Sequence, residues 1–262
     1  ARHRQPAMSL HVSVSGNGPK LILLHGWAMH SGIFAPLLPA LNRHFRVHCV
    51  DLPGHGQSLH STLALDFDAV WDDIAASIDE PAYIMGWSLG GLFALHGAAR
   101  FPQRCLGLIM QNASPCFVHR PDWPYGMPAQ VFAAFAADLE SDYAQTLRRF
   151  FMLEAQGSEH LRDDLRLLQR TAFSYGEPKA SVLCDGLQLL EHSDLRAELA
   201  KLSMPSLWLA GRRDKLVSPE AMRQACDSCG GSWALFERGG HAPFLTHPEQ
   251  VTQRILEFTE NP

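Results

Sequence analysis

Ser88 stands between two glycines, Gly86 and Gly90, where a short apolar segment that begins at Tyr83 gives way to an Ala/Leu-rich segment at residues 89–100. The pattern is typical of a nucleophile elbow, a sharp strand-to-helix turn that needs small residues two positions before and two positions after its serine. Such a turn aims the N-terminus of the helix at the serine, where backbone N–H groups favour negative charge. The pattern predicts a nucleophilic serine, and the alternative is a glycine-rich turn in which Ser88 only caps the helix.

A serine hydroxyl is a weak nucleophile near neutral pH, so it needs a histidine to take its proton and a carboxylate to orient that histidine. After an elbow of this kind the acid and then the histidine follow along the chain. Asp214 comes after a predicted apolar strand at residues 204–211, and His241 comes after a predicted strand at residues 232–236. Because the carboxyl ends of parallel strands meet at one edge of a sheet, Ser88, Asp214 and His241 are predicted to converge as a catalytic triad.

Other late aspartates fit the role of the acid less well. Asp185 and Asp194 lie in Leu-rich helical sequence and Asp227 lies near a helix end, so solvated or capping roles are expected for all three. A strand predicted at residues 106–111 ends in Asn112, without a carboxylate where some proteins with this elbow place their acid. Asp214 therefore remains the predicted acid.

Two backbone donors are expected to form an oxyanion hole. A predicted strand at residues 20–24 leads into Trp27, whose N–H would be one donor, and the N–H of Leu89, next to the nucleophile, would be the other. Each such donor is worth about 10²–10³ in rate. His25 and His55 are expected to hold their loops by hydrogen bonds and not to react.

A long insertion, residues 116–193, separates the strand that ends near residue 111 from the strand that begins near residue 206. Its periodicity predicts four short helices near residues 129–139, 142–154, 159–173 and 179–190. The insertion would form a lid above Ser88. Among its aromatic residues, Phe132, Phe135 and Phe173 are expected in the core, whereas Phe150 and Phe151 fit an apolar acyl channel as well as they fit the core.

These elements predict an α/β fold with a mostly parallel central sheet, flanking helices and a helical lid inserted before the last two strands. Residues 8–115 and 194–262 would form the core and residues 116–193 the lid. Residues 1–7 are expected to be added vector sequence or a disordered N-terminus, with Met8 as a natural start. One domain with an insertion fits 262 residues better than two independent domains.

The composition narrows the class of protein. A formal net charge of -5 argues against general affinity for nucleic acid or anionic membranes, and no apolar run approaches the roughly twenty residues of a membrane-spanning helix. Six cysteines without a secretory signal are expected to be reduced thiols of a cytoplasmic protein. Cys226 and Cys229 lack a second Cys/His pair at ligand spacing, so no metal site is expected. A monomer is expected because no long exposed apolar face stands out.

Arginines recur in the predicted lid. Arg162, Arg166 and Arg170 are spaced by four residues and share one helix face, and Arg148 and Arg149 belong to the preceding helix. The residues themselves favour a solvated face paired with nearby acids. The alternative is a surface that docks an acidic carrier, since guanidinium groups bind phosphate and carboxylate well.

The chain resembles the pimeloyl-acyl-carrier-protein methyl ester carboxylesterases of biotin synthesis, within the α/β-hydrolase superfamily. Three motifs are shared widely among serine hydrolases: LHGW at residues 24–27, DLPGHG at 51–56 and GWSLGG at 86–91. More specific are DWPYGM at residues 122–127, RFFMLEAQG at 149–157, DKLV at 214–217 and HAPFLTHP at 241–248. The resemblance covers nearly the whole chain.

The resemblance implies hydrolysis of the methyl ester of a pimeloyl chain on acyl carrier protein, with release of methanol and no metal or organic cofactor. It implies Ser88, Asp214 and His241 as the triad and contact with the acidic carrier by Arg149, Arg162 and Arg166. The implied substrate contacts are Trp27, Ser88, Leu89, Phe150, Phe151, Met152, Leu153, Glu154 and His241. Two departures from the family pattern are Gly239-Gly240, where two alanines are commoner, and Gln145, at a position that is often basic.

Two other functions stay open. A broad-specificity short-chain carboxylesterase or a carbon–carbon bond hydrolase would use every catalytic residue named above. A ligand receptor built on a hydrolase scaffold would keep the triad but turn substrate over only vestigially. Rapid multiple turnover would separate the enzymes from the receptor.

Overall fold

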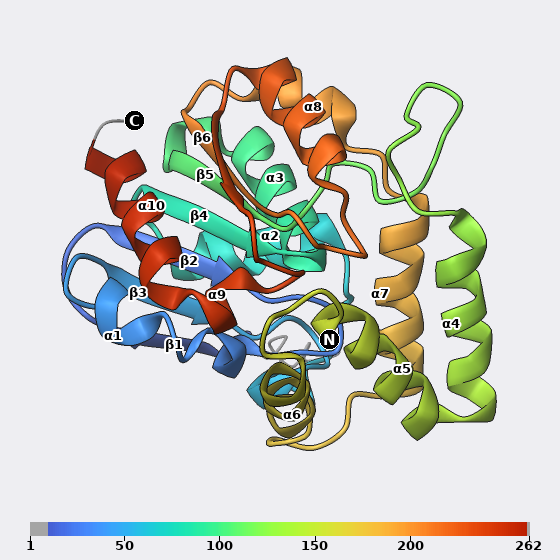
Figure 1. Cartoon of the computed structure of the whole chain (residues 1–262). Helices are drawn as coiled ribbons and strands as arrows, with labels where there is room; N and C mark the ends of the chain where they lie inside the picture. The colour runs from blue at the N-terminus through green and yellow to red at the C-terminus, as the bar shows by residue number, and fades with distance from the viewer. Residues whose placement is uncertain (1–9, 261–262) are drawn as a thin grey trace, which may run out of the picture.

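This computed structural model describes residues 10–260 of the chain. Its centre is a seven-stranded sheet (Figure 1). The strand order is β1-β3-β2-β4-β5-β6-β7, and only β1 is antiparallel to its neighbour. The strands are β1 Val12–Ser15, β2 Lys20–Leu24, β3 Arg46–Val50, β4 Ala82–Trp87, β5 Cys105–Gln111, β6 Ser206–Gly211 and β7 Ser232–Phe236. The predictions for residues 1–7 and Met8 lie outside the described residues.

Helices cover both faces of the sheet, which explains why its central strands are mostly apolar and almost entirely buried (Figure 1). One face carries α2 Phe67–Ser77, α3 Leu89–Arg100 and α8 Pro219–Cys229; the other carries α1 Leu38–Leu41, α9 Pro243–Thr246 and α10 Pro248–Glu260. Four short 3₁₀ helices complete the core: η1 Ser31–Phe34, η2 Gly56–Ser58, η3 Pro102–Arg104 and η4 Arg196–Lys201. No helix within residues 10–260 is both long and apolar enough to span a bilayer.

The turn from β4 to α3 has the tight geometry that the sequence predicts. Ser88 has φ 54° and ψ -120°, a conformation that side-chain-bearing residues rarely adopt. A side chain on Gly86 would collide with the backbone of Gly90, and one on Gly90 would collide with the carbonyl oxygens of Leu24 and His25. The glycines therefore allow α3 to pack directly against the ends of β2 and β4.

Four lid helices stand between β5 and β6, as predicted: α4 Ala129–Ser141, α5 Tyr143–Ala155, α6 Leu161–Ala172 and α7 Ala180–His192. Asp142 caps α5 by accepting a hydrogen bond from the backbone of Gln145. Helix α4 packs against α5 and α7, and α7 also contacts α3 of the core. In Figure 1, α4, α5 and α7 lie to the right of the sheet and α6 lies below it.

Most of the lid aromatics are buried, but one prediction was wrong. Phe132, Phe135, Phe150 and Phe151 are buried, whereas Phe173 is 38% exposed. Helix α6 ends at Ala172, one residue before Phe173, so this side chain leaves the helix face that packs on the core. Its ring keeps an edge contact with Phe151, with 6.2 Å between ring centroids.

The close contact at the elbow predicts a stability difference. Gly90→Ala should lower the free energy of unfolding by about 1–3 kcal/mol, because the added methyl group is forced against two backbone carbonyls. Gly230→Ala is the matched control, since Gly230 has φ 66° and open space around it and should lose only about 1 kcal/mol of backbone strain. Urea unfolding measures both variants. A Gly90→Ala variant no less stable than Gly230→Ala contradicts the packing argument.

Candidate active site

Ser88, Asp214 and His241 follow the carboxyl ends of β4, β6 and β7, respectively. His241 Nδ1 donates to Asp214 Oδ2 at 2.8 Å, and both side chains are fully buried. The indole Nε1 of Trp87, the residue before Ser88, donates to the carbonyl oxygen of His241 at 2.9 Å. These bonds join the strand that carries the serine to the loop that carries the histidine.

The other ring nitrogen of His241 is buried and has no hydrogen-bond partner within residues 10–260. The hydrogen bond from Ser88 Oγ to His241 Nε2 is thus not closed in this structure. Catalytic hydrogen bonds of unliganded enzymes are often long and tighten when substrate binds. With Nδ1 holding its proton on Asp214, Nε2 is the unprotonated atom that can accept a proton.

Asp214 receives four hydrogen bonds. Oδ1 accepts from the backbone N–H groups of Leu216 and Val217 at 2.8 and 3.0 Å. Oδ2 accepts from His241 and from Asn112 Nδ2, the latter also at 2.8 Å. A buried carboxylate needs such donors, because removing its charge from water without compensation is very costly. The arrangement suits an ionised Asp214.

Asn112 is a site residue that the sequence analysis did not identify. It follows β5 with φ 45°, and its Nδ2 bridges Asp214 Oδ2 and the carbonyl oxygen of Gly240, the second contact at 3.0 Å. Gln111 Nε2 donates to the Asn112 side-chain oxygen at 2.5 Å and so fixes the orientation of the amide. The sequence does indicate its position, because Asn112 is a polar residue at the end of a predicted strand, on the edge of the sheet where the triad was expected.

The loop after β2 lies directly beside the nucleophile. A Cβ built on Gly26 would lie 3.3 Å from Ser88 Cβ and 3.0 Å from the Trp87 ring. His25 braces this loop as predicted, donating from Nδ1 to Gly26 O at 2.8 Å and accepting at Nε2 from Leu52 N at 2.9 Å. Burial lowers the pKa of His25 to about 3, so the ring is neutral at physiological pH.

Three residues other than glycine have positive φ: Ala28, Ser88 and Asn112. This set is complete for the part of the chain that the structure describes, and its members follow β2, β4 and β5 at one edge of the sheet. Such conformations cost about 1–3 kcal/mol each and concentrate at functional sites. The strain independently points to the edge where Asp214 and His241 meet.

The two expected oxyanion donors border this edge. The backbone N–H groups of Trp27 and Leu89 have no hydrogen-bond acceptor among the residues that the structure covers. The Trp27 side chain is buried, its Nε1 donates to the carbonyl oxygen of Leu183 in α7 at 2.8 Å, and its ring centroid lies 4.3 Å from that of Phe150. The role of both N–H groups as oxyanion donors stays a prediction.

Helix α5 sends two side chains toward the site. Phe150 and Glu154 are one turn apart and share a helix face; Phe150 packs on Trp27, and the Glu154 carboxyl group is fully buried. Neither oxygen of Glu154 has a partner within residues 10–260. Burial, reinforced by the negative charge of Asp214, raises the pKa of Glu154 well above its usual value and so favours its uncharged form.

The other three residues of α5 that are expected to contact substrate differ in burial and packing. Phe151 packs beside Phe173, Leu153 is partly buried, and Met152 is 46% exposed. The structure thus brings Phe150 and Glu154 toward the triad but turns Met152 to solvent. The contacts implied for Phe151, Met152 and Leu153 stay predictions.

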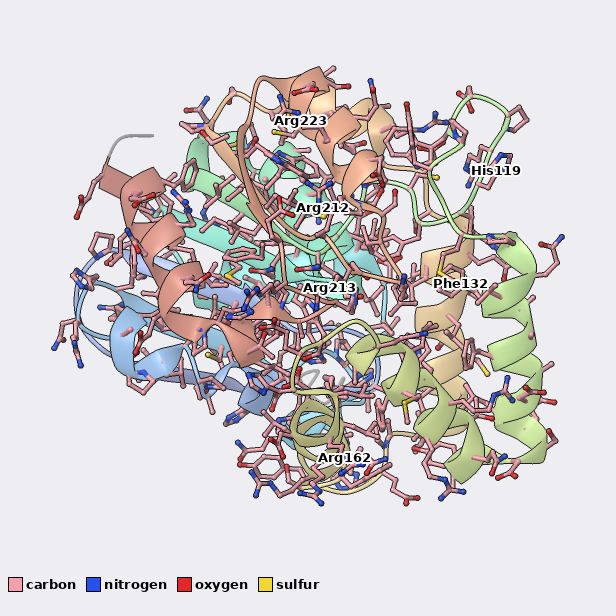
Figure 2. The ribbon with its side chains drawn as sticks, in the orientation of Figure 1. His119, Phe132, Arg162, Arg212, Arg213 and Arg223 are labelled. Atoms are coloured by element: carbon pink, nitrogen blue, oxygen red, sulfur yellow. The ribbon has the colours of Figure 1, made fainter. Side chains whose placement is uncertain are left out.

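The arginines implied in carrier contact are exposed on α5 and α6, with Arg162 visible on α6 in Figure 2. Arg149 pairs with Asp138 at 2.6 Å and Arg166 pairs loosely with Asp163 at 3.8 Å. Surface pairs of this kind contribute little to stability.

Within residues 10–260 no three Asp, Glu, His or Cys groups gather closely enough to hold a metal ion.

The buried Glu154 predicts a pH-dependent stability. Between the pKa of an unfolded Glu, about 4.3, and its raised folded pKa, only the folded chain holds the proton, so the free energy of unfolding falls as pH rises. Glu154→Gln removes this titration. The stability of this variant relative to the unsubstituted chain should therefore be greater at pH 8 than at pH 5. Each unit of pKa difference is worth about 1.4 kcal/mol. Urea unfolding at both pH values measures the gain, with Glu140→Gln as an exposed control; an equal effect at both pH values contradicts it.

The chain is similar in sequence to proteins of a known family. The family model described as alpha/beta hydrolase fold matches residues 19–248. A pimeloyl-[acyl-carrier protein] methyl ester esterase of Xanthomonas campestris pv. campestris (strain B100) is 49% identical over 251 residues, which cover 95% of this chain and 98% of that protein. A protein of the same name from Stenotrophomonas maltophilia (strain R551-3) is 47% identical, with coverages of 95% and 96%.

Solved structures agree on the fold. An esterase from Exiguobacterium antarcticum superposes with a TM-score of 0.87 at 23% identity, covering 96% of both chains. An enol-lactonase from Burkholderia xenovorans LB400 gives 0.83 at 20% identity, also with 96% of both chains. At such identities the likeness concerns the fold alone. From the family match and the two close relatives, the chain belongs to the α/β-hydrolase fold family, among the pimeloyl-[acyl-carrier protein] methyl ester esterases.

Proposed function

We propose that this chain is a serine carboxylesterase that hydrolyses the methyl ester of a pimeloyl group on acyl carrier protein, a step of biotin synthesis. The observation that carries the chemistry is the buried 2.8 Å bond from His241 to Asp214, next to the elbow that presents Ser88. The substrate is supported by the names of relatives that are 47–49% identical over nearly their full length.

The proposed reaction begins at Ser88. His241 Nε2 takes the proton as Oγ attacks the ester carbonyl, and the N–H groups of Trp27 and Leu89 stabilise the oxyanion. His241 then returns the proton to the methoxy oxygen, and methanol leaves an acyl-enzyme. Water, activated by the same histidine, releases the free acid and restores Ser88. Asp214 stays ionised throughout and holds the His241 ring in position.

The acyl chain is proposed to lie against α5. Phe150 offers an apolar wall beside Trp27, and burial raises the pKa of Glu154, which favours the uncharged form of this carboxyl group. A wall of low charge suits an uncharged methyl ester, whereas a free carboxylate there would meet the charge of Asp214. The same arrangement favours departure of the acid product.

The acidic carrier is proposed to approach over α5 and α6. Arg162 and Arg166 are exposed one turn apart on α6, and Arg149 lies on α5. The pairs of Arg149 with Asp138 and of Arg166 with Asp163 are exposed and weak, so phosphate or carboxylate groups of a carrier can compete for these guanidinium groups.

Turnover by Ser88→Ala is the first test. The unsubstituted enzyme should hydrolyse carrier-bound pimeloyl methyl ester through many turnovers and with a higher kcat/KM than p-nitrophenyl acetate, because the carrier and acyl chain add binding energy. Ser88→Ala should lose at least about 10³ in kcat on both substrates. Higher kcat/KM on the short ester would favour a general carboxylesterase, and near-normal activity of Ser88→Ala would overturn the triad.

Substitutions around the acid form a second test. Asp214→Asn should lower kcat by about 10⁴, because the ring of His241 would be held in the wrong tautomer. Asn112→Ala should lower kcat by up to about 10² by loosening Asp214. Asp227→Asn, at the exposed aspartate of α8, is the matched control and should leave kcat unchanged. Steady-state kinetics checks all three; equal effects at Asp214 and Asp227 would rule out Asp214 as the acid.

A further inference from the structure

The two proposed oxyanion donors meet at one residue of the lid. Trp27 lies in the loop after β2 and Leu89 begins α3, yet both side chains border Gly186, which lies in the middle of α7. A Cβ built on Gly186 would lie 2.7 Å from Trp27 Cδ1, 3.1 Å from Trp27 Nε1 and 3.4 Å from Leu89 Cδ2. Any side chain at this position would displace the indole ring.

A hydrogen bond fastens the indole to the same helix. Trp27 Nε1 donates at 2.8 Å to the carbonyl oxygen of Leu183, which lies three residues before Gly186 on the same face of α7. Phe150 of α5 packs on the ring with 4.3 Å between centroids. A glycine inside a helix costs about 1 kcal/mol relative to alanine, so the close approach of Trp27 gives Gly186 its physical reason.

The backbone around Trp27 has little freedom to absorb a shift of the ring. Ala28, the next residue, is held at φ 60°, and Gly26, the previous residue, packs against Trp87 and Ser88. His25 braces the same loop through its two ring nitrogens. Movement of the indole is therefore passed to the Trp27 N–H, and a displacement of about 1 Å at a reacting centre can lower the rate by about 10².

We infer that helix α7 sets the geometry of the oxyanion hole, with Gly186 and the Leu183 carbonyl as positioning groups that act through Trp27. The inference rests on the proposed function, because it takes the Trp27 and Leu89 N–H groups as the oxyanion donors. The lid then does more than cover the acyl chain, because the position of α7 on the core sets the rate of the reaction at Ser88.

Gly186→Ala tests the inference on a substrate too short to reach along the lid. With p-nitrophenyl acetate, kcat should fall by about 10² while KM changes little, because only stabilisation of the transition state is lost. Affinity for a boronic acid that forms a tetrahedral adduct on Ser88 should fall in parallel. Gln188→Ala, exposed on the same helix, is the control and should leave both quantities unchanged.

A double-mutant cycle separates positioning through Trp27 from a general disturbance of the lid. Trp27→Ala removes the whole indole ring, including both atoms nearest to Gly186, so adding Gly186→Ala in that background should lower kcat less than about twofold. This outcome is informative even if Gly186→Ala alone folds poorly, since removing the ring relieves the collision. Equal effects of Gly186→Ala in both backgrounds, or an effect confined to the KM of long-chain esters, would overturn the inference.

Ser88→Ala in the same assays separates a failure of the proposed function from a failure of the role inferred for α7. If Ser88→Ala is inactive but Gly186→Ala and Trp27→Ala act independently, the proposed function stands and the role of α7 is lost. If Ser88→Ala keeps its activity, the oxyanion assignment fails with the triad. Thermal melting of each variant verifies that a loss of rate is measured on folded protein.

Discussion

Asp214 is a charged group placed where water cannot reach it, and the site is built around satisfying that charge. Its two oxygens accept from His241, from Asn112 and from two backbone N–H groups of its own loop. A buried carboxylate without such partners would lose its charge or destabilise the fold. The requirement ties the loops after β5, β6 and β7 together, and Trp87 extends the connection to the strand of the nucleophile.

The loop after β2 forms a second connection, between the core and the lid. Trp27 donates to the Leu183 carbonyl of α7, and His30 Nε2 donates at 2.7 Å to the Thr171 carbonyl at the end of α6. Two side chains of one short loop thus hold two of the four lid helices. Because this loop also supplies a proposed oxyanion donor, attachment of the lid and the chemistry of Ser88 depend on the same backbone segment.

Local patterns made much of the molecule predictable. The β4–α3 elbow needs glycines for steric reasons that a sequence displays, and the strand-end positions of Asp214 and His241 follow from parallel-sheet geometry. The roles of Asn112 and Gly186 depend instead on partners far along the chain. A helical glycine seen without Trp27 against it indicates only a weaker helix.

Covalent labelling of the resting enzyme tests, without any substrate, whether the buried His241–Asp214 pair activates a single serine. We expect a fluorophosphonate to add one phosphonyl group, located by peptide mass spectrometry on Ser88, at a rate that drops sharply in His241→Ala and in Asp214→Asn. Modification of a different serine, or equal labelling rates in all three proteins, would contradict activation of Ser88 by His241 and Asp214.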